Sequence, residues 1–171
     1  YPLNLVLSLF PKNGIAEFYE LYQSQVIFHF TLASWFTFIF LRKLNLDFLS
    51  SVLGGSVYAF GGFFFSHAHH ANMVHSGIWL PAVFYCCLKG FEDDSKWIWV
   101  CPLLLAISLL GGHPQMTLFI CYAFSLFYIF LAWGKSDLII FYLVRFVVII
   151  VSFLLLSAVQ ILPTVEFLNQ T

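Results

Sequence analysis

The sequence predicts an all-α protein, a polytopic transmembrane helical bundle of about six spans. Two features of the composition point to this class: 61% of the 171 residues are hydrophobic, and only 9% are charged. A soluble domain has about 25% charged residues, so this chain could not cover a water-facing surface. Its apolar runs approach the length of about 20 residues that a membrane-spanning helix needs. The net charge of −1 leaves no electrostatic footprint for nucleic acid.

We interpret the chain as a single transmembrane domain, in which turn residues separate the apolar spans. We expect the segment of residues 1–22 to lie at the outer membrane interface, because Pro11 and Gly14 break it, with Ile15 to Tyr22 as the first turns of the first helix. Since the chain opens on Tyr1 without a signal-peptide pattern, we interpret it as a fragment of a longer protein. The spans are expected at residues 23–41, 48–66, 76–90, 96–111, 115–133 and 138–162.

The second span contains a stripe of small residues, Ser51, Gly55 and Ala59, at four-residue spacing. Small residues on one helix face allow two helix backbones to approach closely, so this stripe predicts a packing surface. The pair Gly61-Gly62 is expected to loosen the same helix near its end. The four cysteines all lie in apolar segments without metal-type spacing, and we interpret them as reduced packing residues.

Basic residues lie in alternate loops. The loops after the first, third and fifth spans contain five, whereas the other loops contain only Lys12. The positive-inside rule therefore predicts that the first set is cytoplasmic and that the histidine-rich turns face outward. The basic residues in question are Arg42, Lys43, Lys89, Lys96 and Lys135, and the outward histidines are His67, His69, His70, His75 and His113.

The histidine turn has three interpretations. His67 and His70 are three residues apart and would share one face of a helical turn, with His69 between them. They could form half of a metal site, for which the divalent ion would need further ligands from His75, His113 or Glu166. They could instead bind substrate, or simply form a polar turn near lipid headgroups. The sequence has no H-E-x-x-H or comparable signature that would choose among these.

A second turn, Gly111-Gly112-His113-Pro114-Gln115, has a more specific pattern. Gly112 can adopt a positive φ and end one helix, and Pro114 suits the first position of the next. The N–H groups of the new helix would then lie near His113 and Gln115, where they could bind a phosphate. The alternative is a tight interhelical turn without a ligand.

Three polar residues lie within the last apolar run or just after it. Glu166 could act as a base, bind a sugar hydroxyl or pair with a histidine, or it is a solvated charge at a helix end. Gln160 lies nearly within the membrane and is expected to need a hydrogen-bond partner. Arg145 is expected to snorkel to the inner headgroups, with an inward contact to a lipid phosphate as the alternative.

Several motifs in their order resemble those of the bacterial YfhO-like membrane proteins, in the GT-C class of polytopic glycosyltransferases. The resemblance covers nearly the whole chain. Its motifs are Tyr1-Pro2-Leu3-Asn4, Gly54 to His67 with Tyr58-Ala59-Phe60-Gly61-Gly62, Asn72-Met73, Trp79-Leu80-Pro81, Gly111-Gly112-His113-Pro114-Gln115 and Ser157-Ala158-Val159-Gln160-Ile161-Leu162-Pro163-Thr164-Val165-Glu166.

The resemblance implies a GT-C-like membrane domain that transfers a sugar from a polyprenyl-phosphate carrier to a cell-envelope acceptor. The reaction would take place at the outer face of the bacterial cytoplasmic membrane, among membrane lipids. The catalytic carboxylate of this class is expected outside the chain, so no catalytic residue is assigned. No cofactor is required by this interpretation, although a divalent metal stays open. The substrate-binding candidates are His67, His69, His70, His113, Gln115, Gln160 and Glu166.

Three other functions fit the same composition. The chain could belong to a multi-pass transporter or metal-handling protein that uses the outer-face histidines as ligands. It could be a membrane haem protein in which His29, in the outer part of the first span, and a turn histidine ligate the iron. It could also be a structural subunit without catalysis.

Overall fold

The computed structural model describes residues 15–133, 135 and 138–170, and these residues form helices without any strand. The predicted all-α class is therefore confirmed for the described part of the chain. In chain order the elements are α2 (Ile15–Lys43), α3 (Phe48–Phe60), α4 (Gly62–Ser66), α5 (Ala71–Gly77), α6 (Leu80–Glu92), η1 (Ser95–Val100), α7 (Cys101–Leu110), α8 (Pro114–Ala132), α9 (Ile139–Leu156) and α10 (Ala158–Asn169).

Within the described ranges, five helical segments are long and apolar enough to cross a membrane, and a sixth is shorter. The sixth, Ser95–Leu110, corresponds to the predicted span 96–111. Its first six residues are the 3₁₀ helix η1, whose steeper rise gives the segment a length of about 27 Å. The five long segments are Tyr19–Lys43, Phe48–Ser66, Ala71–Glu92, Pro114–Ala132 and Ile139–Leu156.

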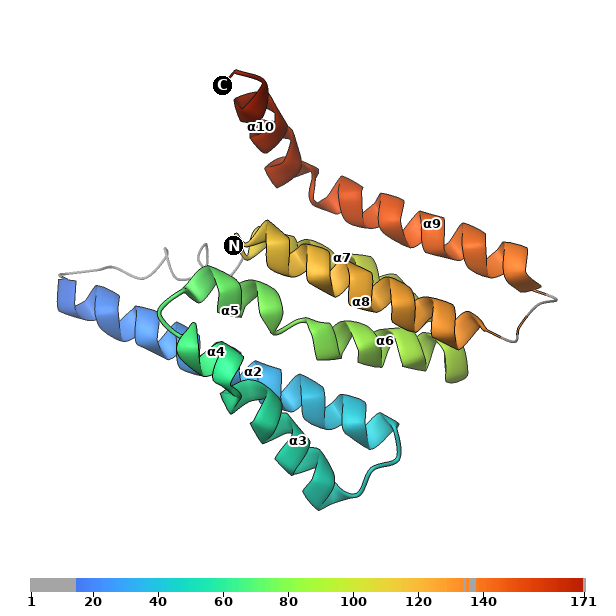
Figure 1. Ribbon diagram of the computed structural model, residues 1–171, viewed down its shortest axis with the longest axis horizontal. Helices are drawn as coiled ribbons and strands as arrows, with labels where there is room; N and C mark the ends of the chain where they lie inside the picture. The colour runs from blue at the N-terminus through green and yellow to red at the C-terminus, as the bar shows by residue number, and fades with distance from the viewer. Residues whose placement is uncertain (1–14, 134, 136–137, 171) are drawn as a thin grey trace.

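The helices pack side by side around two hydrophobic clusters. In Figure 1, α2 and α6 run next to each other, with α3 on one side and α8 and α9 on the other. One cluster joins α2 to α3, α4 and α5, and includes Ala33, Ala59 and Val74. The other joins α6, η1, α7, α8 and α9 around Phe124 and Ile149. The outward faces stay apolar, which suits a chain surrounded by lipid.

The predicted stripe of small residues is the buried face of α3. Ser51, Gly55 and Ala59 are its buried residues, and α3 packs on α2. A Cβ atom added at Gly55 would lie 2.7 Å from the carbonyl oxygen of Ser34 on α2. The two backbones therefore meet at a distance that only glycine permits without a shift.

The expected interruption near Gly61 is also present. Gly61 has an extended backbone, with φ −62° and ψ 158°, and it ends α3 and precedes α4. The predicted second span, 48–66, is therefore two helices in line. The third span begins earlier than predicted, because Ala71–Gly77 already forms α5, and this places His75 in a helix instead of the turn.

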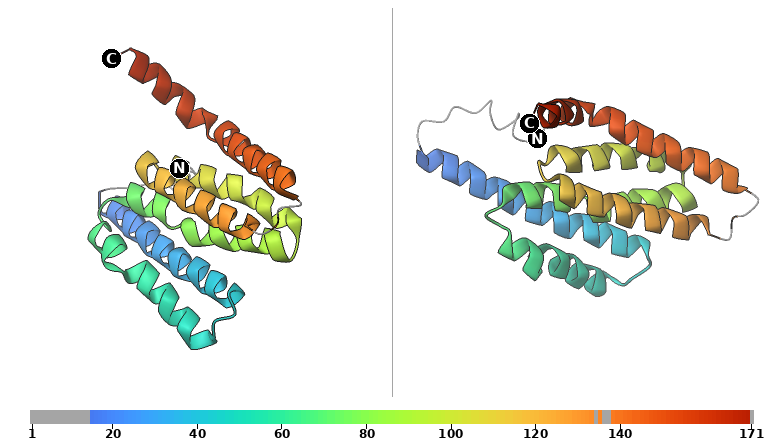
Figure 2. Two further views of the ribbon diagram at one scale, coloured as in Figure 1. Left: turned by 45° about the vertical axis from the view of Figure 1, so that its right-hand side comes forward. Right: turned by 45° about the horizontal axis from the view of Figure 1, so that its top comes forward.

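The last predicted span, 138–162, differs most from the structure. α9 ends at Leu156, and after the buried Ser157 the chain continues as α10 in a new direction. Figure 2 shows α10 leaving the bundle, and none of its residues is buried. Pro163 lies inside α10 and lacks the N–H that would bond Val159. The apolar run is therefore longer than the straight helix that it forms.

Candidate functional site

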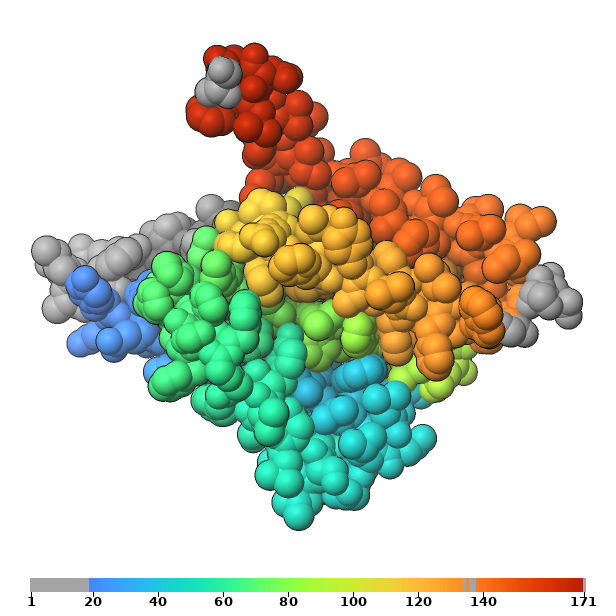
Figure 3. Space-filling view, in the orientation of Figure 1, coloured from blue at the N-terminus to red at the C-terminus, as the bar shows by residue number. Residues whose placement is uncertain are grey.

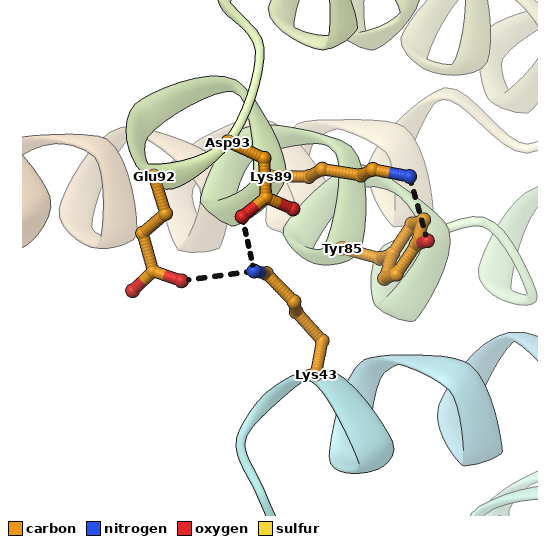
Figure 4. Close-up of polar contacts among 5 residues, drawn as sticks. All are labelled: Lys43, Tyr85, Lys89, Glu92 and Asp93. Carbon is orange, nitrogen blue, oxygen red and sulfur yellow. Dashed lines mark hydrogen bonds and ion pairs between the residues drawn. The ribbon is translucent and has the colours of Figure 1, made fainter.

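Turns occur at two ends of the bundle, which we call the basic end and the histidine end. The basic end holds turns 44–47 and 93–94. There the Lys43 ammonium lies 2.8 Å from the Asp93 carboxylate and 3.2 Å from that of Glu92 (Figure 4). These ion pairs join the first two basic loops, which agrees with the prediction that the basic loops lie on the same side of the membrane.

Arg145 takes neither of its two expected positions. Its side chain is only 7% exposed, and Nη2 donates hydrogen bonds to the carbonyl oxygens of Gly90, at 3.2 Å, and Ser95, at 3.1 Å. These carbonyls lie around the end of α6, where a helix leaves acceptors without intrahelical partners. The guanidinium therefore fastens α9 to the turn between α6 and η1, and it does not reach out to the headgroups.

The histidine end contains the turns 67–70 and 111–113. In the first, between α4 and α5, His69 and His70 are exposed and His67 is half-buried. The Tyr22 hydroxyl of α2 donates to the His69 carbonyl at 2.9 Å, so the turn rests on α2. His67 Nδ1 lies 2.7 Å from the Phe63 carbonyl. Because a carbonyl only accepts, His67 Nδ1 is the donor in this contact.

Within the part of the chain that the structure describes, the predicted metal pair of His67 and His70 acquires no further ligands. The rings of His67 and His70 have centroids 6.2 Å apart, and His70 is closer to His69, at 4.1 Å. Among the described residues, no group of three or more histidine, cysteine or acidic side chains is arranged to hold a metal. A structural zinc site needs four ligands, so the described turn offers an incomplete site.

Ser76 connects the second turn to α5, α7 and α8. It accepts the His113 N–H at Oγ, 3.3 Å away, and the Ser108 hydroxyl at its carbonyl, 2.8 Å away. A Cβ atom at Gly111 would lie 2.6 Å from Ser76 Oγ, so the turn packs directly on α5. Gly112 has the expected positive φ, +91°. The predicted helix stop at this turn is confirmed, and Ser76 lies at its centre.

His113 is the N-cap of α8, and Pro114 occupies the first turn as predicted. The His113 Nδ1 accepts the N–H of Met116 at 3.3 Å. Pro114 has no N–H, so the cap leaves the Gln115 N–H as the first-turn donor available to a ligand. Because Nδ1 accepts, the proton of the neutral ring is on Nε2. His113 and Gln115 thus each present one N–H donor at the same helix start.

A second histidine pair lies buried below these turns. His29 of α2 and His75 of α5 are 0% and 4% exposed, and their ring centroids are 4.3 Å apart. His29 Nδ1 donates to the Gln25 carbonyl at 2.6 Å. Rings in such contact leave no space for a haem plane between them, so this pair does not fit the bis-histidine haem interpretation.

Sequence reasoning placed His75 in the outer turn and left the contact with His29 unrecognised. The available signal was local: His75 lies four residues before Trp79, whose indole N–H donates to the His75 carbonyl at 2.8 Å. That spacing is helical, so His75 could have been placed on the helix that opens the third span. Which residue it would meet on α2 depended on the tertiary packing.

An apolar groove of about 610 Å³ runs beside the second turn. Gly77, next to Ser76, and Met116, next to Gln115, belong to its wall, and the Tyr58 hydroxyl donates to the Gly77 carbonyl at 3.0 Å. In Figure 3 the yellow-green surface of the α6 region is set back between α3–α5 and α8. The lining residues are Val57, Tyr58, Gly61, Gly62, Phe63, Phe64, Gly77, Leu80, Met116, Phe119, Ile120 and Ala123.

Gln160 and Glu166 lie apart from this site. Both are on α10, where Gln160 is half-buried and Glu166 is exposed. α10 extends away from the turns that carry the histidines (Figure 2). The described structure therefore brings His113 and Gln115 together with Ser76, and the turn His67–His70 with α2, but it does not add the two α10 residues to either group.

Neither a family model, nor a curated protein, nor a solved structure matches this chain.

Proposed function

We propose that the chain is part of a membrane glycosyltransferase of the YfhO-like, GT-C type, which uses a polyprenyl-phosphate-linked sugar at the outer face of the bacterial cytoplasmic membrane. The observation that carries this proposal is the apolar groove that ends at the Ser76–His113 turn. A polyprenyl chain needs an apolar surface open to the membrane, and its phosphate needs polar groups at one end of that surface. The groove and turn supply both.

The second turn would hold the phosphate. Its donors are the His113 Nε2–H, fixed by the Nδ1 cap, and the Gln115 N–H at the start of α8. Donors positioned before the reaction stabilise negative charge as it develops on the leaving phosphate. The helix dipole of the 19-residue α8 adds to the attraction of an anion. An acceptor hydroxyl would displace the phosphate, and an acidic residue outside this chain would take its proton.

The orientation of the bundle supports an outer-face reaction. The ion pairs of Lys43 with Glu92 and Asp93 place the first two basic loops at one end, which the positive-inside rule assigns to the cytoplasm. The groove and its polar turn then open at the outer face. His67, His69 and His70 would line the approach of the acceptor beside this turn.

The test separates the two roles of His113, as helix cap and as phosphate donor. His113→Ala removes both, whereas His113→Asn keeps an N-cap side chain and removes the Nε2–H. Glycans are measured on cells that carry each variant in the full-length protein, at matched protein level. We expect both variants to lose glycan transfer. Normal transfer by His113→Asn would show that capping is the whole role of His113 and would remove it from the mechanism.

The groove has its own test. Ala123→Trp would fill the groove from α8. Leu126→Trp places the same side chain on the same helix, at a residue that is 70% exposed and outside the groove. Binding of a radiolabelled polyprenyl phosphate to the purified full-length protein should be lost in the first variant and kept in the second. Equal binding by both variants would contradict a lipid carrier in this groove.

A second candidate function is a transporter, for which the buried pair of His29 and His75 is the specific observation. Ionisable groups inside a membrane bundle often belong to a transport pathway. If the chain is a transporter, His29→Phe should abolish solute uptake by proteoliposomes that contain the purified protein. If it is a glycosyltransferase, the unaltered protein takes up no solute, and His29→Phe changes only its stability.

A further inference from the structure

A separate apolar groove of about 320 Å³ lies between α8 and α9, towards the basic end. Its residues come from the last turns of α8 and the first turns of α9, so it lies at the opposite end of α8 from the Ser76–His113 turn. Trp133 at its edge is 83% exposed, as expected for an aromatic residue at a membrane interface. The groove is lined by Tyr128, Ile129, Ala132, Trp133, Ile139, Tyr142, Leu143 and Phe146.

A lysine lies at the end of this groove. The Lys135 ammonium is 5.6 Å from the ring centroid of Tyr142, a groove residue, and 5.1 Å from that of Phe91. The two rings stack on each other with centroids 5.1 Å apart and an interplanar angle of 9°. Cation–π attraction holds the ammonium beside the aromatic pair while the side chain stays exposed to a ligand.

A second cation strengthens the positive potential at this place. The Arg145 guanidinium carbon lies 5.5 Å from the ring centroid of Phe91, so the ring is shared by two cations. Arg145 is buried and bonded to carbonyl groups, which leave its charge uncancelled. The acids at the end of α6 all bond other groups: Glu92 and Asp93 share Lys43, and Asp94 accepts the Lys96 N–H as the N-cap of η1. A ligand here would therefore carry an anionic group and an apolar chain.

We propose that this groove is a binding site for an anionic glycerophospholipid. One acyl chain lies between α8 and α9, and the phosphate pairs with Lys135 within the field of Arg145. Charge complementarity selects an anionic headgroup over a zwitterionic one. The site is at the basic end and takes a structural lipid, so it is independent of the proposed glycosyl transfer.

The headgroup is tested by native mass spectrometry of the whole chain, titrated with dioleoyl-phosphatidylglycerol or dioleoyl-phosphatidylcholine. We expect the anionic lipid to bind more tightly. Lys135→Ala should weaken it about fivefold, the effect of one basic residue near an anionic surface. Lys96→Ala, which removes an exposed lysine at the same end, should leave it unchanged. Equal loss in both variants would show a general surface charge effect and would overturn the site.

The acyl chain is tested by filling the groove. Ile129→Trp adds bulk in the groove, and Leu126→Trp adds it one turn away, outside the groove. Only the first should release dioleoyl-phosphatidylglycerol. A variant that fails to fold is replaced by competition on the unaltered protein, in which soluble glycerol phosphate should not displace the lipid. Displacement by glycerol phosphate, or equal retention by both tryptophan variants, would contradict an acyl chain in this groove.

Discussion

Gly54 and Gly55 are neighbours on α3 that meet α2 in different ways, and substituting each by alanine tests the close packing of the two helices. A Cβ atom at Gly55 would lie 2.7 Å from the Ser34 carbonyl oxygen, which belongs to the α2 backbone. A Cβ atom at Gly54 would meet the end of the Leu41 side chain, which can rotate away. The two substitutions therefore add the same atom against a rigid neighbour and a flexible one.

The two effects have opposite expected signs. Alanine in a helix interior is favoured over glycine by about 0.5–1 kcal/mol. At Gly54 this gain should remain, less a small cost for turning Leu41. At Gly55 the backbone contact must open, and overpacking costs about 1–3 kcal/mol. We therefore expect Gly54→Ala to be neutral or slightly stabilising, and Gly55→Ala to lose about 1–2 kcal/mol on balance.

The assay is thermal unfolding of the full chain in detergent, followed with a thiol-reactive dye. Three of the four cysteines, Cys86, Cys87 and Cys101, are buried and would react only as the bundle opens. A change of 1 kcal/mol shifts Tm by about 2–4 °C for a chain of this size. Gly55→Ala should therefore lower Tm by a few degrees relative to Gly54→Ala. A rise in Tm for Gly55→Ala equal to that for Gly54→Ala would refute the close approach of the two backbones.

Three other outcomes are expected. The Ser50 hydroxyl and N–H both bond the Asp47 carboxylate, at 2.6 and 2.9 Å, and hold its pKa below its usual value. The stability that this N-cap adds is present above the unfolded pKa of about 3.9 and should decline as pH falls through the folded pKa. Asp47→Asn should remove that pH dependence of Tm, and an unchanged dependence would contradict the cap. The pair of Lys43 and Asp93 is partly exposed, so a double-mutant cycle should give about 0.2–1 kcal/mol that shrinks in high salt; a salt-independent value would count against an exposed ion pair. The buried cysteines should resist maleimide in the folded protein, whereas rapid labelling of all four would show that the bundle is open.

Much of the architecture could be predicted because the bilayer and the backbone impose local rules. A chain with so little charge must place its apolar runs in helices, since lipid cannot satisfy free N–H and C=O groups. The helix stop at Gly112 and the start at Pro114 follow from φ preferences of single residues. The stripe of Ser51, Gly55 and Ala59 follows from helical periodicity.

The candidate site was only partly predictable. His113 and Gln115 were recognised from the turn in which they lie, but their partner Ser76 comes from a distant element. The metal interpretation assumed that His113 or Glu166 would approach the turn of His67 and His70, and no such group of ligands forms among the described residues. Such convergence is a property of how helices pack, which no spacing within one turn encodes.

The sequence by itself determined the membrane class, the apolar helices, their alternation between a basic and a histidine end, and the turn chemistry at Gly112 and Pro114. Only the tertiary structure decided that His75 meets His29 inside the bundle, that Arg145 binds the carbonyls at the end of α6, and that α10 leaves the bundle. The physical reason is the range of the interactions. Hydropathy, periodicity and φ preference act within a few residues, whereas these contacts join helices 46 to 55 residues apart through the packing of their side chains.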